Sequence, residues 1–198
     1  MIKIYGPKQS SAARCMWLLE EAGVAYENIH VDMASGGHKT AEYLALNPNG
    51  KVPTLVDGDF VLWESIAIMN YIVEKYAPQL GGSTVEERAL INQWTLWSVI
   101  HLYHSFSVLF MQKWRNTPDN DATAAAHTEI PRWLGILNAA LENKTYLVAE
   151  KFTLADITAA SIVMRADVIG ISLSEYPAIT AWLTPILSRP AAQKVNAA

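Results

Sequence analysis

The spacing of hydrophobic and polar positions changes along this chain and divides it into two parts. In the first part, short runs with strand-like alternation take turns with runs whose apolar residues recur at helical spacing. Helices that connect strands imply parallel pairing, whereas a closing hairpin adds an antiparallel pair. The pattern predicts strands over residues 2–5 and 24–31, a hairpin over 52–63, and helices over 12–22, 36–46 and 65–76.

The second part of the chain is predicted to be helical throughout. The stretch "PQLGGS" at 78–83 is typical of a linker, and the helical period follows it with few strand signals. We therefore expect a small α/β domain over 1–77, a linker over 78–83, and an all-helical domain over 84–198. The expected helices cover residues 85 to about 115, from after the break at 116–121 to about 143, 153–170, and 176–189 with a kink near Pro185.

Composition narrows the class of protein further. The 198 residues are 51% hydrophobic and 17% charged, which suits a substantial buried core. A net charge of −4 without a basic run gives nucleic-acid binding no electrostatic support. The start "MIKIYG" is too polar for a signal peptide, and no apolar stretch approaches the ~18 residues of a membrane span. A single cysteine cannot form an internal disulfide, so we expect a soluble, cytoplasmic protein.

One segment resembles a known family closely. The segment is "NPNGKVPTLVDGDFVLWESIAIMNYIVEKY" (Asn47 to Tyr76), with Asn-Pro, Val-Pro, a hairpin and Glu-Ser at a helix start. It resembles the glutathione-binding half of cytosolic glutathione transferases. The resemblance is strong over the first 77 residues and generic beyond them. It implies a thioredoxin-like N-terminal domain followed by a helical-bundle domain, which matches the division above.

The resemblance implies glutathione-binding roles for four residues of this segment. Ser65 begins a helix, where free backbone N–H groups and the helix dipole favour an anion such as the γ-glutamyl carboxylate. Glu64 beside it would pair with the ligand's ammonium group. The peptide between Val52 and Pro53 is implied to be cis, with the Val52 backbone pairing with the cysteinyl backbone. From the residues alone, Ser65 is equally an ordinary N-cap, and Val52-Pro53 a tight strand entry.

The glycine carboxylate of glutathione would need a positive contact. His38 lies nine residues before Asn47, as in theta-like classes, where that histidine faces this carboxylate. Lys51 directly precedes Val52 and is a second candidate, and Lys39 replaces His38 if the short second helix is rotated.

The catalytic group must stabilise a thiolate, because free thiols are mostly protonated at neutral pH. In serine-type members a hydroxyl at the start of the first helix donates to the sulfur. Theta-like spacing, four residues before Arg14, points to Ser10, and the position of the cysteine in beta-like members points to Ser11. Tau-like and phi-like spacing would point to Gln9, which cannot play this role in the same way. Tyr5 matches tyrosine-type members, and a serine here can also be a plain N-cap.

Two further motifs are interpreted as structural. Cys15 lies among apolar positions of the first helix and is expected to be a small buried hydrophobe. The absence of Cys-x-x-Cys excludes thioredoxin-type dithiol exchange. Thr153 and Asp156 have capping-box spacing at the start of a helix.

The helical part would supply the pocket for the second substrate. In the family, the helix that corresponds to 85–115 lines the electrophile pocket, which makes Tyr103, Phe106, Phe110 and Met111 candidates for its wall. Core packing is the more frequent explanation for such an aromatic stripe. His101 and His104 have metal-ligand spacing, but no third ligand is evident, so we expect no metal.

The sequence therefore supports two hypotheses. The first is a glutathione S-transferase that attacks a small apolar electrophile, or a peroxidase, isomerase or dehalogenase on the same fold. The second is a non-catalytic glutathione-transferase-like binding module. The resemblance also implies a homodimer, and we expect neither a nucleic-acid nor a membrane partner.

Overall fold

The computed structural model describes residues 1–196 and divides into two compact units. Unit 1 comprises Met1–Leu80 together with Arg189–Ala198, and unit 2 comprises Gly81–Ser188. The expected helical domain includes residues 189–196, whereas these residues group here with unit 1. Over residues 1–196, no helix is both long enough and apolar enough to cross a membrane.

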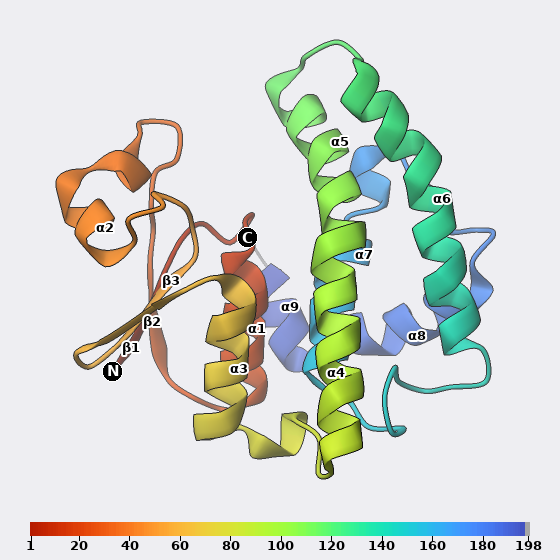
Figure 1. Ribbon diagram of the computed structural model, residues 1–198, viewed down its shortest axis with the longest axis horizontal. Helices are drawn as coiled ribbons and strands as arrows, with labels where there is room; N and C mark the ends of the chain where they lie inside the picture. The colour runs from red at the N-terminus through yellow and green to blue at the C-terminus, as the bar shows by residue number, and fades with distance from the viewer. Residues whose placement is uncertain (197–198) are drawn as a thin grey trace. The chain divides into compact units, whose positions relative to one another are not determined.

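Unit 1 is built on a four-stranded mixed sheet (Figure 1). Its strands are β1 (Ile2–Tyr5), β2 (Tyr26–Ile29), β3 (Thr54–Asp57) and β4 (Phe60–Trp63), in the order β2-β1-β3-β4. β1 pairs parallel with β2 across a helical connection and antiparallel with β3, and β3 and β4 form an antiparallel hairpin. This is the thioredoxin-like arrangement that the sequence predicted.

Two helices cover one face of this sheet. α1 (Ala12–Glu21) and α3 (Ser65–Tyr76) pack against each other and against the strands, while α2 (Ala41–Leu46) lies on the other side (Figure 1). α2 is shorter than the predicted helix over 36–46, because a separate 3₁₀ turn (Gly37–Lys39) precedes it. The Thr40 hydroxyl then caps α2 by accepting from the backbone N–H of Tyr43.

The last helix of the chain belongs to the same unit. α9 (Pro190–Asn196) packs on α1 and buries Ala192 and Val195. Arg189 makes two hydrogen bonds to the Glu21 carboxylate, of 2.7 and 2.6 Å, and Lys194 pairs with Glu20. Unit 1 therefore includes a helix from the C-terminal part of the described chain, and this helix packs on α1.

Unit 2 is entirely helical. Residues 85 to 115, predicted as one helix, form α4 (Val85–Trp97), a π-helical segment (Ser98–Tyr103) and α5 (His104–Arg115). The α-helices on either side of the π segment each keep their own apolar period. The segment between them has only six residues, so the apolar pattern does not reveal it. The remaining elements are α6 (Asp121–Leu141), α7 (Leu154–Val163), a 3₁₀ turn (Asp167–Ile169), and α8 (Pro177–Leu187), which contains Pro185.

α7 lies in the core of unit 2 and ends earlier than the predicted helix over 153–170. Its start carries the capping box expected from Thr153 and Asp156, which is thus confirmed. Asp156 also accepts from the backbone N–H of Leu147 and from Nε1 of Trp182, at 3.0 Å each. The buried carboxylate therefore anchors α7 to two other segments of unit 2.

Candidate functional site

Two neighbouring hydroxyl groups lie at the start of α1. Ser10 Oγ accepts from the backbone N–H of Ala12 at 3.1 Å and donates to the carbonyl oxygen of Pro7 at 2.7 Å. Ser11 is the N-cap residue, and its Oγ donates to the carbonyl oxygen of Val52 at 3.4 Å, a long hydrogen bond. Ser10 is thus engaged within its own turn, whereas Ser11 reaches across to the segment before β3.

The Val52 segment lies close to both serines. A Cβ added to Gly6 would lie 3.1 Å from Cβ of Val52 and 3.5 Å from Oγ of Ser10. The Val52–Pro53 peptide bond is cis, as the resemblance implied. The start of α1 and this cis-proline segment therefore form one side of the candidate site.

A buried polar cluster holds this segment in place. Tyr43 and Asn47 both donate to the carbonyl oxygen of Lys51, at 2.7 and 2.8 Å. The same two side chains contact Thr54 Oγ1, at 2.9 and 3.2 Å. The sequence does not identify these supporting residues, and Asn47 serves there only as part of the Asn-Pro element of the family pattern. Three polar side chains from α2, the loop and β3 fix the backbone on both sides of Pro53.

The start of α3 forms the second side of the site. Glu64 precedes the helix with φ of +73°, a costly conformation for a residue with a side chain. Glu64 is exposed and makes no capping hydrogen bond, while Ser65 is buried. The N–H groups at the start of this 12-residue helix are thus without a side-chain cap, which favours a bound anion.

Cys15 connects the two helix starts. Its sulfur lies 3.6 Å from the carbonyl oxygen of Ser65 and 4.0 Å from that of Ser11, within the range of thiol hydrogen bonds. The side chain is completely buried, and this desolvation raises the pKa of the thiol to about 12 although the charge of Arg14 acts against it. Cys15 is therefore an inert packing residue, as the sequence predicted.

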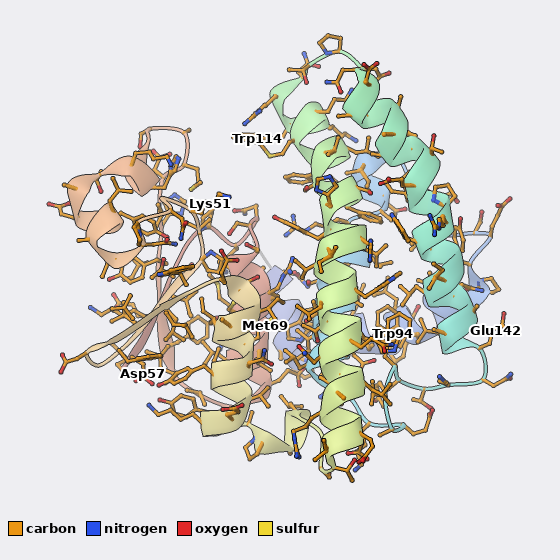
Figure 2. All side chains as sticks on the ribbon, viewed as in Figure 1. Lys51, Asp57, Met69, Trp94, Trp114 and Glu142 are labelled. Carbon is orange, nitrogen blue, oxygen red and sulfur yellow. The ribbon has the colours of Figure 1, made fainter. Side chains whose placement is uncertain are left out.

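Three residues that carry basic side chains, His38, Lys39 and Lys51, lie at or next to the loop at Gly50. Lys51 is exposed at the α2 end of unit 1, away from Asp57 at the end of β3 (Figure 2). A Cβ added to Gly50 would lie 2.7 Å from Nζ of Lys39 and 2.9 Å from the carbonyl oxygen of His38. His38 Nδ1 is buried and has no hydrogen-bond partner among residues 1–196. The fold thus brings the backbone of His38 and the side chain of Lys39 to the loop that leads into Lys51.

The other two candidates for the catalytic group differ in their surroundings. The Tyr5 ring is half-buried and lies 6.2 Å from that of Tyr43, centroid to centroid. Gln9 is exposed in the turn before α1. Neither side chain shows the contact with the cis-proline segment that Ser11 makes.

The electrophile candidates all lie in unit 2. Tyr103 in the π segment is 37% exposed, Phe106 is buried, and Phe110 and Met111 on α5 are half-buried. His101 stacks on Trp133 with ring centroids 4.5 Å apart. The described residues contain no group of three or more His, Cys, Asp or Glu side chains placed to hold a metal ion.

Comparison with known proteins identifies the family. A family model described as the glutathione S-transferase N-terminal domain matches residues 2–74, and one described as the C-terminal domain matches residues 96–190. Together these matches span most of the chain. The protein therefore belongs to the glutathione S-transferase family.

Individual relatives agree with this assignment over nearly the whole length. The chain is 33% identical to glutathione S-transferase F9 of Arabidopsis thaliana, over 96% of this chain and 94% of that protein. It is also 33% identical to glutathione S-transferase 3 of Zea mays, over 100% and 94%. The crystal structure of a theta class glutathione S-transferase from Xanthomonas axonopodis pv. citri, with glutathione bound, superposes with a TM-score of 0.90. That structure shares 41% sequence identity, over 98% of this chain and 95% of the other.

Proposed function

We propose that this glutathione transferase binds glutathione at the end of unit 1 where α1, the Val52 segment and α3 begin. The carrying observation is that these three segments meet: Ser11 contacts Val52, and Cys15 contacts the carbonyl groups of Ser11 and Ser65. In the reaction, the glutathione thiol gives its proton to solvent. Its sulfur then forms a bond to an electrophilic carbon of an apolar substrate, whose leaving group departs with the bonding electrons.

Each part of glutathione has a chemically matched partner in this arrangement. The uncapped start of α3 and the Ser65 hydroxyl bind the γ-glutamyl carboxylate, and Glu64 pairs with the ammonium group. The Val52 backbone pairs with the cysteinyl backbone. His38, Lys39 and Lys51 offer positive charge or hydrogen-bond donors to the glycine carboxylate.

A serine hydroxyl would supply the thiolate stabilisation. A single donated hydrogen bond, together with the dipole of α1, supplies about 1.5–3 kcal/mol, which corresponds to about one to two pKa units. Ser11 is supported by its contact with Val52, and Ser10 by its theta-like spacing before Arg14. Ser10 and Ser11 are therefore both candidates for the hydroxyl that donates to the glutathione sulfur.

Isothermal titration calorimetry tests the binding site. We expect Ser65→Ala to weaken glutathione binding about tenfold, because one hydrogen bond to a charged group is lost. Ser83→Ala, an exposed serine in the linker, is the matched control and should leave the affinity unchanged. If the wild-type protein binds no glutathione at millimolar concentration, the proposed function is wrong.

Titration of bound glutathione by its ultraviolet thiolate absorbance tests the catalytic group. The serine that donates to sulfur should, when changed to alanine, raise the thiol pKa by about one to two units. Ser10→Ala and Ser11→Ala serve as controls for each other, because the fold places them one residue apart. Unchanged curves in both variants would remove the serines from this role and favour Tyr5.

We also infer that the protein is a cytoplasmic homodimer. The large apolar side chains Leu90, Leu96 and Ile100 are between 42 and 60% exposed along α4 and the π segment, which suits burial by a second copy. Light scattering coupled to size-exclusion chromatography should give twice the 21.9 kDa chain mass. A mass of one chain at micromolar concentration would contradict the dimer.

A further inference from the structure

Arg165 is a half-buried cation without a carboxylate partner among residues 1–196. It lies just beyond the end of α7, in the turn that leads to the 3₁₀ segment. The ion pairs of the described chain involve Lys75, Arg189 and Lys194, and none involves Arg165. The side-chain contact that the structure gives its guanidinium is with the Phe110 ring, whose centroid is 5.5 Å from Cζ.

The surroundings of this guanidinium are unusual for a buried charge. Partial removal from water disfavours a cation, and proteins usually compensate it with a carboxylate. Arg189 follows that rule, since it pairs with Glu21 through two hydrogen bonds. For Arg165, desolvation lowers the pKa and Tyr103 alone acts in the opposite direction. The Phe110 ring thus lies beside the Arg165 guanidinium, where a carboxylate would be expected.

Two neighbours of Arg165 are among the four candidates for the electrophile wall. Phe110 lies under the guanidinium, and Tyr103 is close enough to influence its pKa. Phe110 is half-buried and Tyr103 partly exposed, so both offer apolar surface to a ligand. Unit 2 by itself therefore combines a fixed positive charge with an aromatic surface.

We propose that Arg165 binds a carboxylate carried by the second substrate, so that the preferred electrophiles are aromatic acids rather than neutral apolar molecules. The planar guanidinium would make paired hydrogen bonds to the carboxylate, and Phe110 and Tyr103 would contact the ring. This inference rests on the proposed function and specifies its substrate class. Arg165 is then a specificity-determining residue that touches the substrate away from the reacting carbon.

Binding of a probe pair tests the site without turnover. Naphthalene carboxylate and its uncharged carboxamide have nearly the same shape and are titrated by calorimetry into the glutathione-free protein. Arg165→Gln should weaken carboxylate binding at least about tenfold and leave the carboxamide unchanged, since a charged hydrogen bond is worth that much. Arg165→Lys should retain part of the affinity, because it keeps the positive charge but loses the planar guanidinium that donates two parallel hydrogen bonds.

Arg115→Gln is the matched control for these titrations. Arg115 is an exposed arginine at the end of α5, so this variant removes the same charge from unit 2. Thermal melting by circular dichroism verifies that each variant folds. Equal effects of Arg115→Gln and Arg165→Gln, equal loss of both probes, or no carboxylate binding by the wild type would each overturn the proposal.

A second probe pair tests the consequence for turnover. The substrates are a chloronitrobenzoate with chlorine para to the carboxylate, and the corresponding chloronitrobenzamide. In both, glutathione sulfur bonds to the ring carbon that carries chlorine, chloride leaves with the C–Cl electron pair, and the thiol proton goes to solvent. Arg165→Gln should lower kcat/KM for the acid about tenfold more than for the amide, mainly through KM.

The outcomes separate this proposal from the proposed function. If wild type conjugates both substrates and Arg165→Gln affects them equally, the protein is a transferase but the preference for acids is wrong. If wild type conjugates neither substrate, binds no glutathione, and still prefers naphthalene carboxylate through Arg165, the transferase function fails and the anion site remains.

Discussion

At the scale of single residues, the loop beside the candidate glycine-carboxylate site depends on a backbone conformation that suits glycine. Gly50 has φ of +57°, and an added Cβ would lie within 3 Å of both the His38 carbonyl oxygen and Lys39 Nζ. Gly50 therefore allows the His38 carbonyl oxygen and Lys39 Nζ to approach closely, and it adopts a left-handed backbone conformation without a side-chain clash. The Lys39 side chain and the His38 carbonyl oxygen can lie this close to the loop because position 50 has no side chain.

We predict that Gly50→Ala destabilises the protein by about 2–4 kcal/mol, through both backbone strain and crowding. Gly58 offers a matched control: its φ is +62°, but an added Cβ would meet nothing within 4 Å. Gly58→Ala should therefore cost only the conformational part, about 1–2 kcal/mol. Urea unfolding measures both values, and calorimetry should show weaker glutathione binding for Gly50→Ala alone. Equal losses would mean that crowding is absent.

A second residue-scale prediction concerns Asp57, the last residue of β3 in the β3–β4 hairpin. Lys75 Nζ and Tyr71 OH donate to Asp57 Oδ2 at 2.7 Å each, and Tyr76 OH donates to the same oxygen. These hydrogen bonds, with that of Lys75 the largest contribution, lower the pKa of Asp57 to about 2. Because the folded pKa lies below the unfolded value of about 3.9, the stabilisation is complete above that value and is lost as pH falls toward 2.

The stability difference between wild type and Asp57→Asn should thus shrink between about pH 4 and pH 2. Urea unfolding at several pH values in this range measures it. Asp59→Asn changes an exposed aspartate in the turn that follows β3 and should leave the profile of the wild type unaltered. A difference that stays constant down to pH 2 would show that the carboxylate is not held by these donors.

At the scale of elements, unit 1 depends on the docking of α9 onto α1. Glu21 is the centre of that contact: its carboxylate accepts from Arg189 and from Nε1 of Trp17, and its side chain is only 8% exposed. Glu20 makes the neighbouring contact with Lys194, whose side chain is 69% exposed. Glu20 and Glu21 are adjacent in the chain, but solvent screens the Lys194 partner of Glu20 more than the Arg189 partner of Glu21.

We predict that Glu21→Ala costs about 3 kcal/mol, because a largely buried pair loses one partner. Glu20→Ala should cost less than about 1 kcal/mol, as exposed pairs contribute little. Chemical denaturation gives both values, and hydrogen exchange should show faster exchange of α9 amides in Glu21→Ala. Comparable costs for the two variants would contradict the difference in burial.

The short elements show where sequence patterns lose information. The predicted helix over 36–46 became a 3₁₀ turn followed by α2, and the predicted helix over 85–115 contains a π segment. Apolar spacing identifies the buried face of a segment, but not the hydrogen-bond ladder within each turn. The Thr40 cap and the start of α1 at Ala12 are local features that polar residues in the sequence do indicate.

At the scale of the whole molecule, Cys15 reports on global opening because it is the sole cysteine of the chain. The thiol is fully buried and its pKa is raised to about 12, so the native protein should present almost no thiolate at neutral pH. In the unfolded chain the thiol pKa returns to about 8.5.

We predict that a thiol-specific reagent labels the native protein several orders of magnitude more slowly than the urea-unfolded protein. The labelling rate should rise with urea in parallel with loss of circular dichroism, because both follow unfolding. Ser11→Ala, which leaves the backbone carbonyl near Cys15 in place, should not accelerate native labelling. Rapid labelling of one thiol per native chain would show that Cys15 is accessible.

The sequence alone determined the order of elements, the sheet with one parallel pair and a hairpin, and the family resemblance of residues 47–76. These follow from local spacing, turn residues and a motif carried on one continuous stretch, 47–76. Only the tertiary structure decided which residues meet. Three contacts join positions that are far apart in the chain. They are those of Cys15 with the start of α3, of Glu21 with Arg189, and of Arg165 with Phe110. Such contacts depend on packing between elements, and spacing along the sequence does not encode them.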